Sequence, residues 1–118
     1  MVSYGRFDVV LVLFPFTEKK GQKQRPAIVL SNRSFNDQHR HAIVAMVTTA
    51  SQTRWPSDLG LSGYVEAGLR SPSVARAKLF TISYDLVPGR VGTLSNADAM
   101  AMENWLGVLI SSKLVSGH

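Results

Sequence analysis

Three segments of this sequence are apolar at almost every position and rich in β-branched residues. They are FDVVLVLF (residues 7–14), PAIVLS (residues 26–31) and AIVAMVTTA (residues 42–50). A strand with one solvent-exposed face alternates apolar and polar residues, so an unbroken apolar run indicates a strand that is buried on both faces. Such strands are typical of a small closed barrel, or of a sheet whose outer face meets another subunit.

Weaker signals predict the remaining strands. SDLGLSG (residues 57–63) allows a short strand, and VPGRVGTLS (residues 87–95) predicts another with turn residues. VARAKLFTI (residues 74–82) alternates, which places one set of side chains on each face. The first face carries Arg76, Lys78 and Phe80, and the second carries Ala75, Ala77, Leu79 and Thr81.

One convincing helix is predicted near the end of the chain. Ser95 is a suitable N-cap, and Asp98 stands three residues later, where its side chain can close a capping-box-like pair. The segment NRSFNDQHRH (residues 32–41), by contrast, is polar and turn-rich. The predicted apolar helix face runs to about residue 110 and consists of Met100, Ala101, Trp105, Val108 and Leu109.

These elements predict a mostly β fold with a C-terminal α-helix, either a small twisted barrel or a curved sheet. The length of 118 residues predicts a single domain over residues 1–118, and 45% hydrophobic residues are enough for an ordinary core. The sequence has no cysteine, which excludes disulfides, thiolate zinc sites and a cysteine nucleophile. No signal-peptide pattern and no membrane-length apolar run is present, so we expect a cytoplasmic protein.

The net charge of +5 favours polyanionic partners, namely nucleic acid or an acidic protein. Residues 1–59 hold eight Lys/Arg against four acids, whereas residues 60–118 hold five against four. Much of the excess lies in the predicted loop of residues 15–25, which contains Gly21. A solvated surface segment explains such a loop equally well, so charge alone indicates no more than polyanion binding. Its four clustered cations are Lys19, Lys20, Lys23 and Arg25.

The sequence pattern alone identifies few candidates for a metal site, a catalytic site or a base-stacking residue. His39 and His41 with nearby Asp37 could chelate a metal ion, but no second cluster completes such a site, so we expect none. No phosphate-binding glycine motif or nucleophile elbow is present. Trp55 and Phe16 lie near basic or polar stretches and could stack on unpaired bases, although packing is the commoner role.

Arg25 and the pair Thr48 and Thr49 are polar groups at predicted strand ends. Arg25 is the last charge before the second apolar strand, and the threonines end the third. Whether they meet depends on how the strands pair, which the sequence does not decide.

Several stretches together resemble the MazF/PemK toxins of bacterial toxin–antitoxin modules. They are GRFDVVLVLFPFT followed by QKQRPAIVLS, then AIVAMVTTA, then SPSVARAKLFTI, in the family order over roughly residues 5–110. The Arg25-Pro26-Ala27 junction with the upstream FPFT is the most specific part. The resemblance implies an SH3-like barrel with a C-terminal helix, a homodimer, and an acidic cognate antitoxin whose tail lies across the active groove.

The resemblance also implies an activity and its residues. Family members are metal-independent endoribonucleases that need no cofactor and cut single-stranded RNA at short sequences, leaving 2′,3′-cyclic phosphate and 5′-hydroxyl ends. The family pattern places the catalytic arginine at Arg25 and the catalytic threonine at Thr48, with the neighbouring Thr49 as the alternative. The residues expected to bind RNA are Phe16, Thr17, Lys19, Lys20, Lys23, Gln24, Thr49 and Lys78.

A guanidinium suits stabilisation of a pentacoordinate phosphate better than proton abstraction, because its pKa exceeds about 12. The general base is therefore unassigned; His39 or His41 could serve only if their segment folds toward the groove. Ala77-Lys78 and Phe80 depart from the family pattern, which bears on the cut sequence. A gyrase-poisoning toxin like CcdB and a catalytically silent nucleic-acid-binding barrel are the alternatives.

Overall fold

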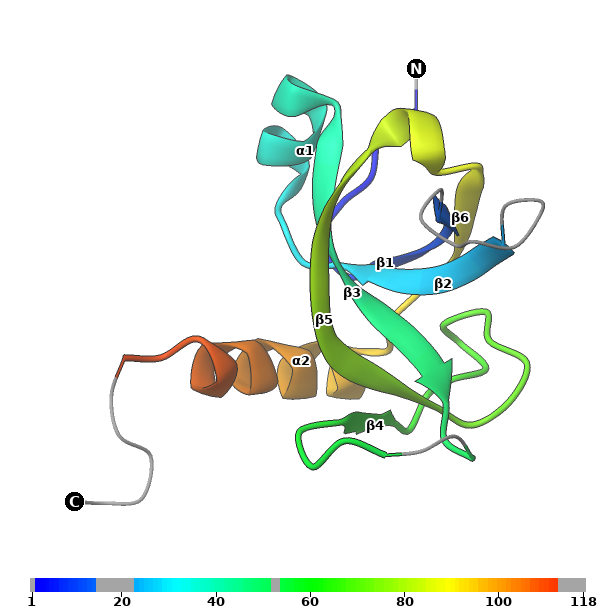
Figure 1. Ribbon diagram of the computed structural model, residues 1–118, viewed down its shortest axis with the longest axis vertical. Coiled ribbons are helices and arrows are strands. Elements are labelled where there is room, and N and C mark those ends of the chain that lie inside the picture. Colours follow the sequence, from blue (N-terminus) through cyan, green and yellow to red (C-terminus); the bar gives the residue numbers. More distant parts are fainter. Residues whose placement is uncertain (1, 15–22, 52–53, 113–118) are drawn as a thin grey trace.

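The computed structural model describes residues 2–14, 23–51 and 54–112. Within these residues one antiparallel sheet has the strand order β4-β5-β3-β2-β1-β6. Its strands are β1 (Asp8–Phe14), β2 (Lys23–Val29), β3 (His41–Thr49), β4 (Leu59–Leu61), β5 (Ser73–Ser83) and β6 (Gly89–Thr93). The helices are α1 (Arg33–His39) and α2 (Asn96–Leu109), and one 3₁₀ turn, η1 (Tyr84–Leu86), links β5 to β6. The sheet curls strongly (Figure 1), which confirms the predicted mostly β fold with a C-terminal helix.

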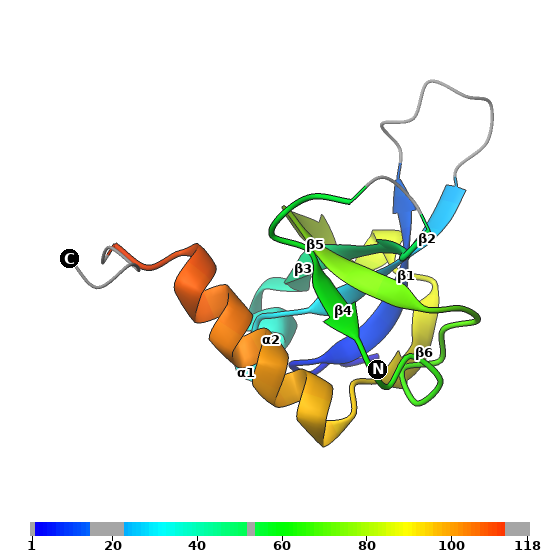
Figure 2. The ribbon, with the colours of Figure 1, turned by 90° about the horizontal axis from the view of Figure 1, so that it is seen from below.

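Two apolar clusters cover the two faces of the sheet, as the unbroken apolar strands predicted. Inside the curl, Val12 and Val44 pack with Tyr4 and Tyr84. On the outside, Val9, Ile28 and Ala45 of the central strands pack under Met102 of α2, which is fully buried. Figure 2 shows α2 lying along this outer side. None of the described helices is long and apolar enough to cross a membrane.

Two register shifts bend the sheet. One lies between Val9 and Val10 in the β1–β6 pair, and the other between Ala45 and Met46 in the β3–β5 pair. Ala45 is opposite Leu79 while Met46 is opposite Arg76, so two residues of β5 have no partner of their own. Such a bulge bends the strand and increases its twist, and here it contributes to the curl.

The predicted start of two strands was wrong by a few residues. β1 begins at Asp8 because Phe7 has a left-handed φ of 70°, which belongs to a turn and not to a strand. β2 begins at Lys23 and ends at Val29, so Pro26 stands in the middle of the strand and not at its start. The additional residues at the start of β2, Lys23 to Arg25, are part of the strand because they pair with β1.

The prediction of a turn-rich segment over residues 32–41 was also wrong, because it contains α1. The side chain of Asn32 caps the helix by accepting from the Phe35 amide at 2.8 Å. Asn36 is fully buried and donates to the backbone oxygens of Tyr4 and Ser31 at 2.9 and 3.1 Å. Arg40, in the left-handed conformation, ends the helix. Tertiary hydrogen bonds thus stabilise a short helix that has little apolar character.

The N-cap of α2 is Ser95, as predicted, and its hydroxyl accepts from the Asp98 amide at 3.2 Å. The Asp98 carboxylate does not close a capping box. It is buried and accepts instead from the Ser62 amide at 3.1 Å, the Ser62 hydroxyl at 2.9 Å and the Gly63 amide at 2.8 Å.

This docking of Asp98 rotates the helix relative to the predicted apolar face. Met100 and Val108 are 75% and 49% exposed, whereas Met102 is fully buried. The inward residues follow Asp98 at helical spacing, and they are Met102, Trp105 and Leu106.

We expect Asp98→Asn to lower the free energy of unfolding by about 1–3 kcal/mol, because the amide nitrogen cannot accept from the three donors of residues 62 and 63. Thermal and denaturant unfolding measure this. Asp85→Asn is the matched control, since Asp85 is exposed, and it should change stability by less than about 0.5 kcal/mol. Equal stability of the two variants would show that Asp98 does not anchor the helix.

Candidate functional site

The candidate site begins where β2 and β3 stop pairing. Leu30 donates its amide hydrogen to the Ile43 oxygen, so alternation along β2 also turns the backbone nitrogen of Pro26 toward β3. Proline has no hydrogen to donate there. The register between the strands accordingly runs only from Val29 opposite Val44 to Ala27 opposite Met46.

Beyond the last β2–β3 pair, within the described residues, β2 is held only by β1, and β3 is held only by β5. β1 pairs with β2 on to Arg25 and Lys23, which lie opposite Val12 and Phe14. β5 pairs with β3 through Thr49, which lies opposite Ser73. The two strand ends therefore diverge while each remains part of a ladder, and Figure 1 shows the resulting fork.

Two cavities occupy this fork, and together we call them the groove. The first has a volume of about 490 Å³ and the second about 440 Å³. Arg25, Val47 and Thr48 line both. The first is also lined by Phe14, Met46, Arg76, Lys78 and Phe80, and the second by Lys23, Gln24, Pro26, Thr49 and Ser73.

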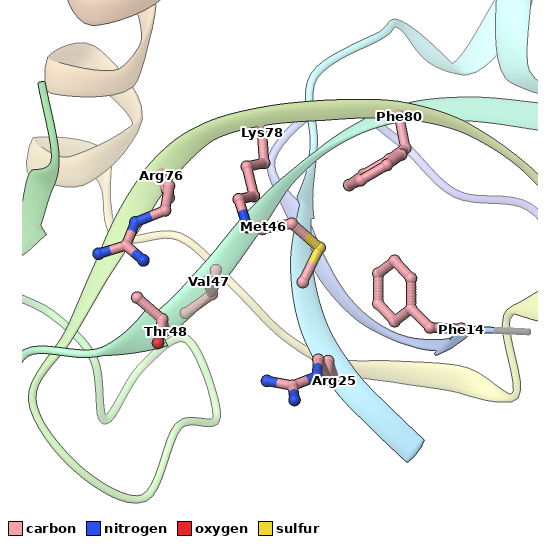
Figure 3. Close-up of a pocket in the computed structure, with 8 residues that line it drawn as sticks. All are labelled: Phe14, Arg25, Met46, Val47, Thr48, Arg76, Lys78 and Phe80. Carbon is pink, nitrogen blue, oxygen red and sulfur yellow. The ribbon is translucent and has the colours of Figure 1, made fainter. Parts of the chain in front are cut away.

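The first cavity has an apolar end and a cationic end (Figure 3). At the apolar end the rings of Phe14 and Phe80 form an edge-to-face pair with centroids 5.8 Å apart, and Met46 lies beside them. At the other end, the side chains of Arg25 and Thr48 extend from the two arms of the fork. This combination suits a ligand that carries both a flat apolar group and a negative charge.

The cations of the groove differ in how far they are neutralised. Arg76 makes a two-pronged ion pair with Asp58, with Nε to Oδ1 at 3.1 Å and Nη2 to Oδ2 at 2.9 Å. The Arg76 side chain is 13% exposed and the Asp58 side chain is fully covered. No acidic residue pairs with Arg25 or Lys78 within the part of the chain that the structure describes.

The Arg76 guanidinium, by hydrogen bonding to Asp58, lowers the pKa of that carboxyl below its ordinary value of 3.8. The Trp55 amide strengthens this effect by donating to Oδ2 at 2.9 Å. The same ion pair raises the pKa of Arg76. Both groups therefore keep their charges near neutral pH.

Six of the predicted site residues line at least one of the two cavities. They are Arg25, Thr48, Lys23, Gln24, Thr49 and Lys78. The alternation predicted for β5 also places Arg76, Lys78 and Phe80 together in the first cavity. Phe16, Thr17, Lys19 and Lys20 lie outside the described residues. The roles assigned to all these residues stay predictions.

His39 and His41 were candidates for the general base only if their segment folded toward the groove, and it does not. His39 is the last residue of α1 and His41 is the first of β3. Thr48 is seven residues further along that strand, at its other end, about 23 Å away for a fully extended strand. Within the described residues, no three His, Asp or Glu side chains gather in a way that could hold a metal ion.

The sequence reasoning did not assign Phe14, Met46, Arg76 or Phe80 to the site. The alternation of β5 contained the signal for Arg76 and Phe80, because it placed them on the face of Lys78. Met46 could be found only from the register between β2 and β3, which no local pattern reports.

A family model described as PemK-like, MazF-like toxin of type II toxin–antitoxin system matches residues 5–110. A search of curated proteins gave no significant match. Many solved structures share the fold.

Three of these structures illustrate the likeness. An endoribonuclease in complex with its cognate antitoxin from a mycobacterial species has a TM-score of 0.73 at 14% identity, covering 98% of this chain and 100% of that one. MazE–MazF from Deinococcus radiodurans has a TM-score of 0.73 at 16% identity, covering 96% and 100%. The Mycobacterium tuberculosis toxin MazF-mt6 has a TM-score of 0.71 at 18% identity, covering 91% and 99%.

We expect Asp58→Asn to destabilise the protein by about 1–3 kcal/mol near neutral pH, because it removes a charge-assisted hydrogen-bonded pair. Since the folded pKa of Asp58 lies below 3.8, its contribution is complete above that pH and is lost as the pH falls through the folded value. The difference in stability between wild type and variant should therefore shrink below about pH 3.8. Unfolding curves at several pH values measure it, and a difference that does not depend on pH would contradict this account.

Proposed function

This chain belongs to the PemK- and MazF-like toxins of type II toxin–antitoxin systems, and on that basis we propose that it is a metal-independent endoribonuclease. Its substrate is single-stranded RNA, cut at a short sequence to leave 2′,3′-cyclic phosphate and 5′-hydroxyl ends. Structural relatives described as endoribonucleases support this proposal at the level of the fold.

One observation carries the proposal to particular residues. Arg25 and Thr48 extend from the two arms of the fork and line the same two cavities. Arg25 is exposed, and no acid within the described residues neutralises it. A guanidinium with free donors beside a hydroxyl is suited to bind a phosphate through paired hydrogen bonds.

The proposed reaction is an internal transesterification. The 2′-oxygen bonds to phosphorus and loses its proton, while the bond from phosphorus to the 5′-oxygen breaks and that oxygen gains a proton. Negative charge develops on the non-bridging oxygens, where Arg25 and Thr48 donate hydrogen bonds that strengthen in the transition state. Arg25 is not assigned as the base, because a guanidinium rarely deprotonates.

The groove provides for the rest of the nucleotide. With the phosphate at the cationic end, a neighbouring base can lie against the rings of Phe14 and Phe80 at the apolar end. Lys78 is placed to contact a further phosphate, and Lys23, Gln24 and Thr49 line the second cavity along the same strand ends. Phe80 can stack on a base at a position where family members often have an arginine. We therefore propose that Phe80 contributes to the choice of the RNA sequence that is cut.

We further propose that the protein acts as a homodimer in the cytoplasm, with residues 1–118 forming one domain, and that an acidic cognate antitoxin inhibits it. The family match over residues 5–110 supports a single domain. Structural relatives bound to antitoxins support the partner. Arg25 and Lys78, which have no acidic partner among the described residues, suit an acidic peptide.

The first test is cleavage of a long unstructured RNA by purified protein in excess EDTA, with the ends of the products mapped. Wild type should cut at discrete sites and leave cyclic-phosphate ends. Arg25→Ala should lower the rate at least about 10²-fold, the scale of losing one donor to a developing charge. Arg25→Lys should restore little, because an ammonium group lacks the paired donors. Thr48→Ala should lower the rate less, and Thr48→Ser should retain it.

Arg6→Ala is the matched control for charge. Arg6 pairs with Glu103 on the surface, at 3.2 Å, and neither lines the groove, so the variant should cut at the wild-type rate. No cutting by wild type on varied RNAs would reject the proposal, and a gyrase assay for the CcdB-like alternative would follow.

The oligomer and the antitoxin are tested separately. Light scattering should give a mass of twice the 12.9 kDa of one chain. The cognate antitoxin should abolish cleavage, and Arg25→Ala with Lys78→Ala should weaken its binding, because two cations facing its tail are lost. A monomeric mass would reject the dimer, and unchanged antitoxin affinity would place that contact elsewhere.

A further inference from the structure

Trp55 is a large aromatic residue that the proposed function does not use. It lies in the connection between β3 and β4, and its side chain is 39% exposed. It belongs to neither apolar cluster, whereas the other tryptophan, Trp105, packs against the outer one. Core packing therefore explains Trp105 and does not explain Trp55.

The backbone around Trp55 is fixed in place. The Trp55 amide donates to the Asp58 carboxylate at 2.9 Å, and the Asp58 amide donates to the Trp55 oxygen at 3.0 Å. Asp58 is in turn held by Arg76 of β5. On the other side, the Trp105 indole donates to the Ser57 oxygen at 2.7 Å. An exposed ring on a rigid support loses little conformational entropy when it binds a ligand.

Two cations that line the groove also contact the Trp55 ring, so the ring borders the groove. The Arg76 Cζ is 5.1 Å from its centroid and the Lys78 Nζ is 5.5 Å, and both residues line the first cavity. Both cations belong to β5 and stand two positions apart on it. The exposed part of the ring is left for a ligand, and its indole N–H makes no hydrogen bond within the described residues.

The two cations have different parts to play. Asp58 neutralises Arg76, so Arg76 acts as a positioning residue that holds the loop and the ring. Lys78 has no acidic partner within the described residues and is exposed. It can bind a phosphate beside the ring, and a base attached to that phosphate would be within reach of the indole.

We propose that Trp55 is a stacking platform for one unpaired nucleobase of the RNA, flanking the nucleotide at Arg25 and Thr48, with Lys78 binding the phosphate between them. This inference rests on the proposed function, because it takes the ligand to be single-stranded RNA. Aromatic stacking accepts any base, so the platform adds affinity and leaves the sequence preference to the groove itself.

The test compares Trp55→Phe, Trp55→Leu and Trp55→Ala for binding of a short single-stranded RNA. The RNA carries deoxyribose at the mapped cut position, so binding is measured without cleavage; a mixed-sequence RNA replaces it if no cut is found. Leucine keeps apolar bulk without a flat ring, and phenylalanine keeps a smaller ring. Binding of this RNA should also quench the tryptophan fluorescence of wild type much more than that of Trp55→Phe, which retains only Trp105.

We expect Trp55→Ala and Trp55→Leu to bind roughly tenfold or more weakly, the scale of losing one stacked base, and Trp55→Phe to lose less than the leucine variant. In cleavage assays KM should rise while kcat stays near the wild-type value. Met100→Ala is the control for loss of an exposed apolar side chain on α2, 75% exposed, and should change neither quantity. Thermal unfolding checks that each variant is folded.

The outcomes separate this inference from the proposed function. If wild type cuts RNA but leucine binds as well as tryptophan, or phenylalanine as weakly as alanine, the platform is wrong and the ribonuclease stands. If wild type cuts no RNA yet binds it with the order Trp, Phe, Leu, the platform stands and the ribonuclease falls. If wild type neither cuts nor binds RNA, both are wrong.

Discussion

The site depends on one missing hydrogen-bond donor. Pro26 stands in the middle of β2 with its nitrogen turned toward β3, where any other residue would donate to the strand opposite. The ladder between the strands ends at Ala27, yet β1 still holds Arg25 in an extended strand. The opening lies within a sheet, so the Arg25 guanidinium and the Thr48 hydroxyl both extend from strands that a neighbouring strand still holds. Rigid backbones give a site the positional accuracy that catalysis requires.

Buried carboxylates fix the loops that surround this frame. Asp8, Asp58 and Asp98 are each covered, and each accepts a hydrogen bond from a backbone amide, at Gly5, Trp55 and Gly63 respectively. A carboxylate accepts several donors at once and binds them more strongly than a neutral acceptor does. Asp58 in this way holds the described part of the connection that borders the groove, through the Trp55 amide and Arg76.

The sequence predicted those features that local composition determines. Apolar residues at both odd and even positions of β1, β2 and β3 predicted burial of both faces, and Ser95 predicted the start of α2. The helix α1 was missed because Asn36 is stabilised by the backbone of Tyr4, a contact distant in sequence. The predicted face of α2 was right at Trp105 and wrong at Met100 and Val108, because nothing local shows that Asp98 is buried. The meeting of Arg25 and Thr48 in one groove likewise could not be predicted, because it depends on how β2 and β3 pair.

The charges of the groove divide into those that hold the protein and those that remain available. Arg76 is paired with a covered carboxylate and contributes to folding, whereas Arg25 and Lys78 have no acidic partner in the described part of the chain. Leaving an exposed cation unpaired costs little, because water solvates it. The fold therefore does not depend on these two cations, and among the described residues an incoming polyanion has no acid to displace before it reaches them. If both RNA and an acidic inhibitory peptide bind these two side chains, as we propose, the two ligands compete for them, and bound antitoxin would keep the toxin inactive.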